Sequence, residues 1–219
     1  MFAFWKRAKA VASAKAVIIP MLSQLQFQTF GTVKPISDQL WADPYFVGFF
    51  HNIVRYWWRH EFKREPSAEE FGDLFFRAIG VATGSATSAS MALNALKNSF
   101  EKLTLAGDLF NENYGATLAR AVRLSGSLAK VVENKEMQLK MAAADVGRDF
   151  VKGADAGLIY INLVMGTGVY DNDARVADAL RACAISGHPL EGTAAAYFYM
   201  SIKLEYKERY GNANNAPWQ

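Results

Sequence analysis

The most hydrophobic helix that the pattern predicts lies between Asp43 and Arg64. The pair Asp43-Pro44 is typical of a helix start, because the carboxylate accepts a backbone hydrogen bond and proline lacks an N–H that the first turn would leave unpaired. Ten large apolar residues then cover an arc of roughly 220° on a helical projection: Tyr45, Phe46, Val47, Phe49, Phe50, Ile53, Val54, Tyr56, Trp57 and Trp58. We therefore expect a central helix, covered on most sides and ending before Pro66.

The remaining side of this helix carries a row of basic residues. His51, Arg55 and Arg59 follow one another at a spacing of four, which places them one above another as a basic ridge. Two interpretations of the ridge stay open. It is a solvated edge that keeps a buried helix soluble, or it is a binding surface for an acidic helix, a carboxylate or a lipid phosphate.

His60 and Glu61 come one turn later and resemble the start of a zinc-protease helix. That motif needs a second histidine four residues after the first, and Arg64 stands there instead. His60 is therefore expected to be a core histidine or a cation favoured by the carboxyl end of the helix dipole.

Helical spacing continues along the rest of the chain, and no segment has a convincing strand pattern. A capping box, Ser67 to Glu70, starts a helix after Pro66. Further helices are expected over residues 91–107, 111–132, 133–151 and 158–165. The small residues of Gly80 to Ser90 indicate a hinge between two helical layers. The pattern predicts an all-α multi-helix bundle of about eight to ten helices, with one domain over residues 36–210 and a polar tail over 211–219.

Residues 1–35 form a basic segment, since five basic residues precede the first acidic one, Asp38. As a helix, residues 1–19 place Phe4 and Trp5 on an apolar side with Lys6, Arg7 and Lys9 largely away from it, and Pro20 begins a further short helix. Three interpretations remain. The segment docks on the domain, anchors at an anionic membrane surface through these aromatic and basic side chains, or is a cleaved targeting segment. The interrupted apolar run disfavours a secretory signal.

Composition narrows the function classes. The 219 residues are 51% hydrophobic and 21% charged, as in an ordinary globular protein. The single cysteine, Cys183, excludes an intramolecular disulfide framework and fits a reducing compartment. The net charge of +3 comes from the N-terminal segment, so nucleic-acid binding is not expected. No apolar run is long enough to span a membrane. We expect a cytoplasmic protein, peripheral to a membrane if the first helix is an anchor.

The C-terminal third contains a turn with two glycines, an aspartate that opens a helix, and spaced small residues: Gly166, Gly168, Val169, Asp173, Ala177, Ala184 and Gly187. On these residues the segment from about 156 to 200 resembles the Sel1-like branch of the tetratricopeptide-type helical repeats. The resemblance implies antiparallel helical hairpins, whose alanines allow close approach, and a protein-binding role.

No catalytic, metal or cofactor motif is found. Ser125-Gly126-Ser127 departs from the serine-hydrolase elbow, and three histidines and one cysteine are too scattered for a metal site without clustered carboxylates. We therefore expect a non-enzymatic interaction scaffold or adaptor with a protein partner. The alternative is a small-molecule binder or enzyme with an apolar cavity beside Trp57 and Trp58, where Arg55, Arg59 or His60 holds an anionic head group.

Overall fold

The computed structural model describes residues 2–25, 37–107, 135–186 and 192–211. These residues contain seven α-helices, one 3-10 helix and no strand, so the predicted all-α fold is confirmed. The elements are α1 (Phe2–Gln24), η2 (Asp38–Ala42), α2 (Pro44–Phe62), α3 (Ala68–Thr83), α4 (Ala86–Ala106), α7 (Lys135–Val164), α8 (Ala174–Ile185) and α9 (Thr193–Tyr210). The helix predicted over 111–132, the Ser-Gly-Ser stretch at 125–127, Gly187 and the tail from 212 lie outside the described residues.

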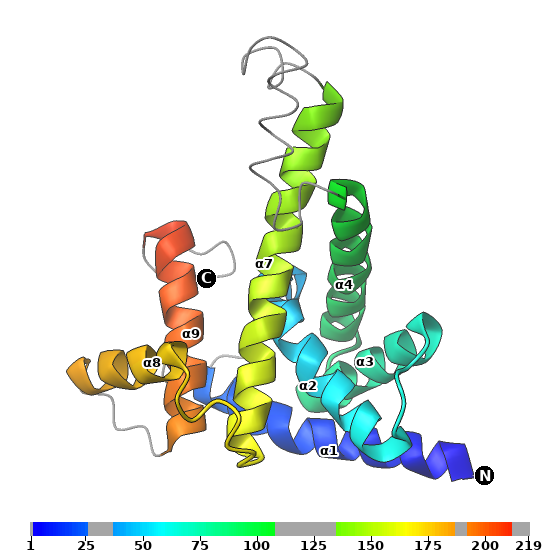
Figure 1. Cartoon of the computed structure of the whole chain (residues 1–219). Coiled ribbons are helices and arrows are strands. Elements are labelled where there is room, and N and C mark those ends of the chain that lie inside the picture. Colours follow the sequence, from blue (N-terminus) through cyan, green and yellow to red (C-terminus); the bar gives the residue numbers. More distant parts are fainter. Residues whose placement is uncertain (1, 26–36, 108–134, 187–191, 212–219) are drawn as a thin grey trace.

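Helix α2 lies at the centre of the bundle. It packs most extensively against the long helix α7, while α1 crosses the base and α3 and α4 cover another side (Figure 1). Six of its large side chains are almost fully buried: Phe46, Phe49, Phe50, Ile53, Val54 and Trp58. The prediction of a central apolar helix is therefore confirmed. Its start is also as expected, because the Phe46 amide donates to Asp43 Oδ1 at 3.0 Å.

The contact between α2 and α7 is a close crossing made by glycines. A Cβ atom added to Gly153 would lie 1.9 Å from the backbone oxygen of Tyr45, and one on Gly157 would lie 2.0 Å from that of Phe49. Gly48 makes the reciprocal approach from α2, at 2.1 Å from a backbone oxygen of α7. Only hydrogen fits at these positions, so the glycines set the distance between the two central helices.

Helix α7 joins two segments that the pattern predicts as separate helices, 133–151 and 158–165. It runs unbroken from Lys135 to Val164, and the helical assignment of residues 158–164 is confirmed. The expected gap between residues 151 and 158 is absent. Burial against α2 outweighs the low helix propensity of Gly153 and Gly157, about 1 kcal/mol each.

A buried polar network ties the start of α2 to α9 and α7. Arg209 donates to Asp43 at 2.9 Å and to Glu205 at 2.8 Å, and it lies 3.5 Å from Asp149. Burial raises the pKa of the Asp43 carboxyl above its usual range, while the Arg209 guanidinium opposes that shift. Asp43 therefore acts both as a helix cap and as the buried partner of an arginine.

The turns around α3 are short and hydrogen-bonded. The predicted capping box is present, since Ser67 accepts from the Glu70 amide and Glu70 accepts from the Ser67 amide. In the predicted hinge, only Gly84, with a φ of 68°, and Ser85 connect α3 to α4. The Ser85 hydroxyl donates to Asp38. The stretch 80–90 is thus mostly helical, with a tight turn in place of a linker.

Helix α1 is part of the same core as the domain. Its buried stripe consists of Ala10, Ala14, Ile18, Met21 and Leu25. Docking, the first of the three interpretations, is what the structure shows. The helix continues without a break through Pro20 to Gln24. The prediction that a separate helix begins at Pro20 is therefore wrong. Burial of the stripe on both sides of Pro20 outweighs the lost backbone hydrogen bond.

The C-terminal helices α8 and α9 pack on each other and cross in the view of Figure 1. As expected, Gly166 and Gly168 have positive φ and Asp173 caps α8. The small residues expected at the helix contact, Ala177 and Ala184, are instead exposed. The buried face of α8 consists of Val176, Ala179 and Cys183. These residues have helical spacing, but Val176 and Cys183 each lie one position before the alanine expected at the contact.

Candidate functional site

The residues of the predicted basic ridge separate in the structure. His51 is only 8% exposed and packs inside the bundle, so its expected place on a continuous cationic ridge is wrong. Arg55 and Arg59 lie at the surface, where Glu65 binds both, with N–O distances of 2.9 and 3.1 Å. The ridge fails because rings of α3, α4 and α7 surround His51, whereas the side chains of Arg55 and Arg59 reach solvent.

The other predicted side chains of α2 also divide between core and surface. Trp58 is fully buried and stacks on Phe62 with ring centroids 4.0 Å apart. Trp57 is half-buried, and His60 is exposed and lies 3.2 Å from the Glu61 carboxylate. Neither tryptophan lines any of the three cavities described below, although one of them lies beside the same helix and is lined by Arg55, Arg59 and His60.

The basic side chains at the start of α1 face the domain. Lys9 lies 3.1 Å from Glu61, Arg7 lies 3.7 Å from Glu70, and the Lys6 ammonium lies 5.7 Å from a ring centroid of α2. Phe4 and Trp5 are each 69% exposed, so these two residues of the expected apolar side do not lie on the buried side of the helix. The charges that a membrane anchor would use are largely taken up by acidic groups of α2 and α3. Among the described helices, none has both the length and the apolarity to cross a membrane.

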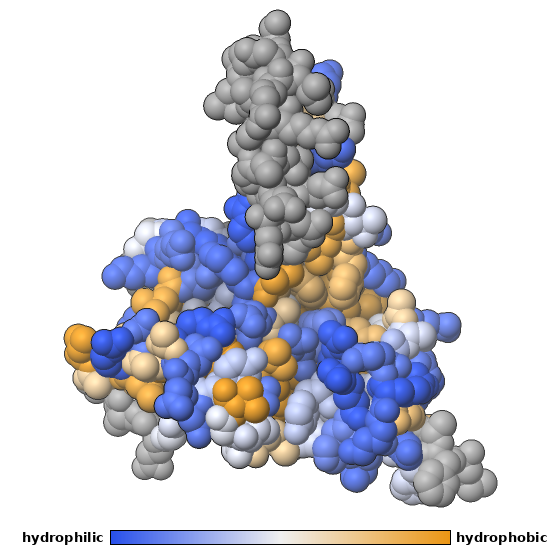
Figure 2. All heavy atoms as spheres, viewed as in Figure 1, coloured by the Kyte–Doolittle hydropathy of each residue, from blue (hydrophilic) through white to orange (hydrophobic). Residues whose placement is uncertain are grey.

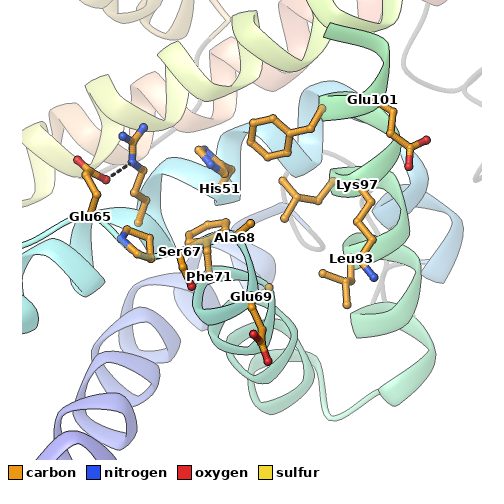
Figure 3. Close-up of a pocket in the computed structure, with 14 residues that line it drawn as sticks. His51, Glu65, Ser67, Ala68, Glu69, Phe71, Leu93, Lys97 and Glu101 are labelled. Carbon is orange, nitrogen blue, oxygen red and sulfur yellow. Dashed lines mark hydrogen bonds and ion pairs between the residues drawn. The ribbon is translucent and has the colours of Figure 1, made fainter. Parts of the chain in front are cut away.

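A cleft of about 720 Å³ opens between α2, α3 and α4. Its floor is apolar and consists mainly of Phe71, Gly72, Leu93, Leu96 and Phe100. Figure 3 shows the floor side chains converging from the three helices, with charged side chains at the edges. A volume of this size and a mainly apolar lining are typical of a binding site.

His51 is the polar group at the back of the cleft (Figure 3). Three phenylalanine rings surround its imidazole edge-on, with centroids 4.8 to 5.7 Å away: Phe71, Phe100 and Phe150. Burial lowers the pKa of the imidazole from 6.5 to about 4, and the positive charge of Arg55 acts in the same direction. The ring is therefore neutral at pH 7.

The hydrogen bonds of Asn52 define which nitrogen of His51 carries the proton. The Asn52 amide donates to the Ala154 carbonyl, so its oxygen is the atom that faces His51 Nδ1, 3.2 Å away. An oxygen can only accept, which makes Nδ1 the donor. In a neutral ring Nε2 is then an acceptor, and it has no hydrogen-bond partner among the residues that the structure describes.

This burial predicts a pH-dependent stability. Since the folded pKa is about 4 and the unfolded pKa is 6.5, the stabilising contribution is complete above pH 6.5 and is lost as the pH falls towards 4. Over that interval wild type should lose about 3 kcal/mol more unfolding free energy than His51→Phe. Urea titrations of both proteins between pH 7.5 and 4 measure the difference.

The paired comparison matters because other groups titrate in the same range. Burial raises the pKa of the Asp43 carboxyl and that of Asp149, which opposes the histidine effect, and both proteins retain these groups. Charged groups near the ring, Arg55 and Glu65, are also common to the two. A wild-type minus variant difference that stays constant with pH would show that His51 titrates normally.

Two smaller cavities lie elsewhere. One of about 430 Å³ is lined by Arg55, Arg59, His60 and neighbouring side chains of α2 and α7, and most of its lining side chains are polar. The other, about 340 Å³, lies near the Arg175 ion pairs of α8. In the described part of the chain, no three His, Cys, Asp or Glu side chains are grouped to hold a metal ion. The cleft at His51 is the largest of the three.

The sequence pattern places Arg55 and His51 at a binding surface, and both line the cleft. It misses the α3 and α4 side chains of the cleft, because Leu93, Leu96 and Phe100 have the spacing of ordinary core residues. In the sequence Phe100 looks like a core residue because it is apolar. In the structure, however, it is 46% exposed. No protein-family model, curated protein or solved structure matches this chain.

The molecular surface in Figure 2 combines apolar and polar areas over the same face. Apolar side chains gather along the middle of this view, and polar side chains surround them on both sides. Isolated apolar side chains at a surface are normal in globular proteins, so exposure alone does not identify a site. The cleft is distinguished by its concave shape and by the buried histidine at its back.

Proposed function

We propose that the protein is a non-enzymatic interaction protein whose α2–α3–α4 cleft binds an amphipathic helix of a protein partner. The observation that carries the proposal is an open apolar cleft with the largely buried His51 at its back, whose Nε2 has no hydrogen-bond partner in the described residues. Such a lining offers apolar burial together with one polar group that can orient the occupant.

The open side of the cleft favours a helix over a small molecule. Small-ligand sites bury about 70–90% of the ligand surface, which requires walls on most sides. Here Phe100, a side chain of the floor, is 46% exposed, so an occupant keeps one side in water. An amphipathic helix meets that condition, because its apolar face enters the groove and its polar face covers it.

The charges at the edge of the cleft indicate the partner's charge. Arg55 is neutralised by Glu65 at 2.9 Å. Glu69, Lys97 and Glu101 also lie at the edge, and neither glutamate has an ion-pair partner in the described residues. These three side chains sum to one negative charge. A partner helix with lysine or arginine beside its apolar face complements them, with modest effect on affinity and more on orientation.

A selection experiment tests the proposal with peptides that need not come from the natural partner. A displayed library of helix-forming peptides with a randomised apolar face is selected on the full-length protein. We expect enriched peptides with apolar anchors at i, i+3 or i+4, and i+7, flanked by basic residues. Their dissociation constants are then measured on wild type and on two variants of α4.

Leu93→Glu and Leu105→Glu form a matched pair. Leu93 lines the cleft, whereas Leu105, on the same helix, is 44% exposed and does not. We expect Leu93→Glu to weaken peptide binding by at least about tenfold and Leu105→Glu to change it by less than about twofold. Selected peptides that bind both variants as tightly as wild type would contradict the proposed function.

A further inference from the structure

His51 has the features of a recognition residue rather than of an ordinary core histidine. More than nine-tenths of its surface is buried, and the ring lies at the back of the cleft (Figure 3). Its Nδ1 is satisfied by Asn52, while Nε2 is an acceptor without a partner in the described residues. Nε2 is not among the fully buried side-chain atoms that lack a partner in the described residues, and His51 lines the cleft. An occupant that covers this nitrogen without donating to it would leave a buried acceptor unpaired, which costs free energy.

None of the donors that line the cleft serves this nitrogen. The Arg55 Nε group donates to Glu65. Lys97 lies at the outer edge of the cleft, on the exposed face of α4. In the free protein a water molecule can donate to Nε2. Displacing that water increases the affinity only if the ligand supplies a donor of its own.

We propose that the partner helix inserts a tryptophan or tyrosine side chain into the cleft and that its N–H or O–H donates to His51 Nε2. This inference rests on the proposed function and specifies the central anchor of the partner. An indole or phenol combines a large apolar body with a polar tip, which matches an apolar floor ending in one acceptor. Tryptophan and tyrosine are also the residues most enriched at interface hot spots.

Other donors fit the site less well. A lysine or arginine would have to bring its charge from water into an apolar floor. Serine and threonine can donate, but they would bury little apolar surface against the floor. Phenylalanine fills the space and leaves the acceptor unpaired. The aromatic rings of the floor instead favour an aromatic occupant, through edge-to-face contacts.

Two pairs of small probes separate the donor from the apolar body. 3-Methylindole and 4-methylphenol can donate, whereas 1,3-dimethylindole and 4-methylanisole have a methyl group in place of the hydrogen. Each is titrated into the ¹⁵N-labelled full-length protein, and its dissociation constant is taken from the shifts of backbone amides. We expect each donor to bind about tenfold more tightly than its methylated counterpart, in line with the effect of leaving a buried acceptor unpaired.

The His51→Phe variant should abolish this preference, with donor and methylated probe binding within about twofold of each other. A readout on wild type is independent of whether that variant folds. The ¹⁵N spectrum of the imidazole should show a protonated Nδ1 and an unprotonated Nε2, and the Nε2 resonance should move on addition of 3-methylindole and not of 1,3-dimethylindole. A purely structural histidine would show no such selective response.

The outcomes distinguish the two levels of the proposal. If donor and methylated probes bind wild type equally and Leu93→Glu weakens both, the cleft binds aromatic groups and the role of His51 is overturned. If the probes bind equally to wild type and to Leu93→Glu, or do not bind at all, both the role of His51 and its use as the centre of a partner site are overturned.

Discussion

Gly153→Ala is expected to lower the free energy of unfolding by about 3 kcal/mol, the upper part of the range for overpacking a core. The added methyl group would lie 1.9 Å from the Tyr45 carbonyl oxygen and 2.7 Å from its carbon. These are backbone atoms of α2, which cannot rotate away as a side chain could. The two central helices must therefore move apart, and the packing of the whole α2–α7 contact is weakened.

Gly80→Ala is the matched control. Gly80 also lies inside a helix, α3, but its added methyl group would meet the Ala89 side chain at an ordinary 3.5 Å. Here alanine should stabilise the protein by about 0.5–1 kcal/mol, since glycine is the poorer helix former. Urea unfolding followed by circular dichroism measures both. Equal effects of the two substitutions would show that α2 and α7 are not in close contact at Gly153.

The second large effect is expected for Asp43→Ala, which should reduce the unfolding free energy by about 4 kcal/mol. Two losses combine. The Phe46 amide loses its cap, and Arg209 loses a partner at 2.9 Å in a site where the aspartate side chain is only 4% exposed. Asp43→Asn should cost less, because the amide oxygen can still accept from the backbone while the charge is removed.

An exposed ion pair supplies the comparison for this effect. Asp178 binds Arg181 on the surface of α8, with both side chains more than half exposed. Asp178→Ala should change the unfolding free energy by less than about 0.5 kcal/mol, as is usual for surface pairs. Thermal and urea unfolding of the three variants measure the order. If Asp43→Ala is no more harmful than Asp178→Ala, the buried network does not hold α2 to α9.

Local signals in the sequence predict the ends and the type of the helices. Asp43-Pro44 and the Ser67 to Glu70 capping box act through neighbours within one turn, so they can be recognised from the sequence alone. The wide apolar arc of α2 similarly requires burial whatever the partner helices are. The all-α fold and the central position of α2 follow from these features.

Contacts between distant segments could not be predicted in the same way. A helical projection shows that His51 shares a face with Arg55 and Arg59, but it does not show that rings of α3, α4 and α7 surround only the first of them. Glycines at 153 and 157 have the spacing of a close helix crossing, and that spacing gains meaning only once α7 is known to be continuous.

The basic residues of α1 illustrate the same limit. The sequence shows that these residues are basic, but it does not show what they contact. Lys9 pairs with Glu61 and Arg7 with Glu70, each more than fifty residues away. The cleft likewise depends on three helices and has no motif of its own. Its clearest feature is His51, a polar residue where the packing would favour an apolar one, and such departures from local rules are expected at functional sites.

The most direct test of a partner site in the α2–α3–α4 cleft is the location of amide shifts when 3-methylindole is titrated into the ¹⁵N-labelled full-length protein. The largest shifts are predicted at cleft residues of α3 and α4, namely Phe71, Gly72, Leu93, Leu96 and Phe100. Shifts confined to the surface around Arg59 and His60 or to α1, or no saturable shifts, would contradict the assignment of the cleft as the binding site.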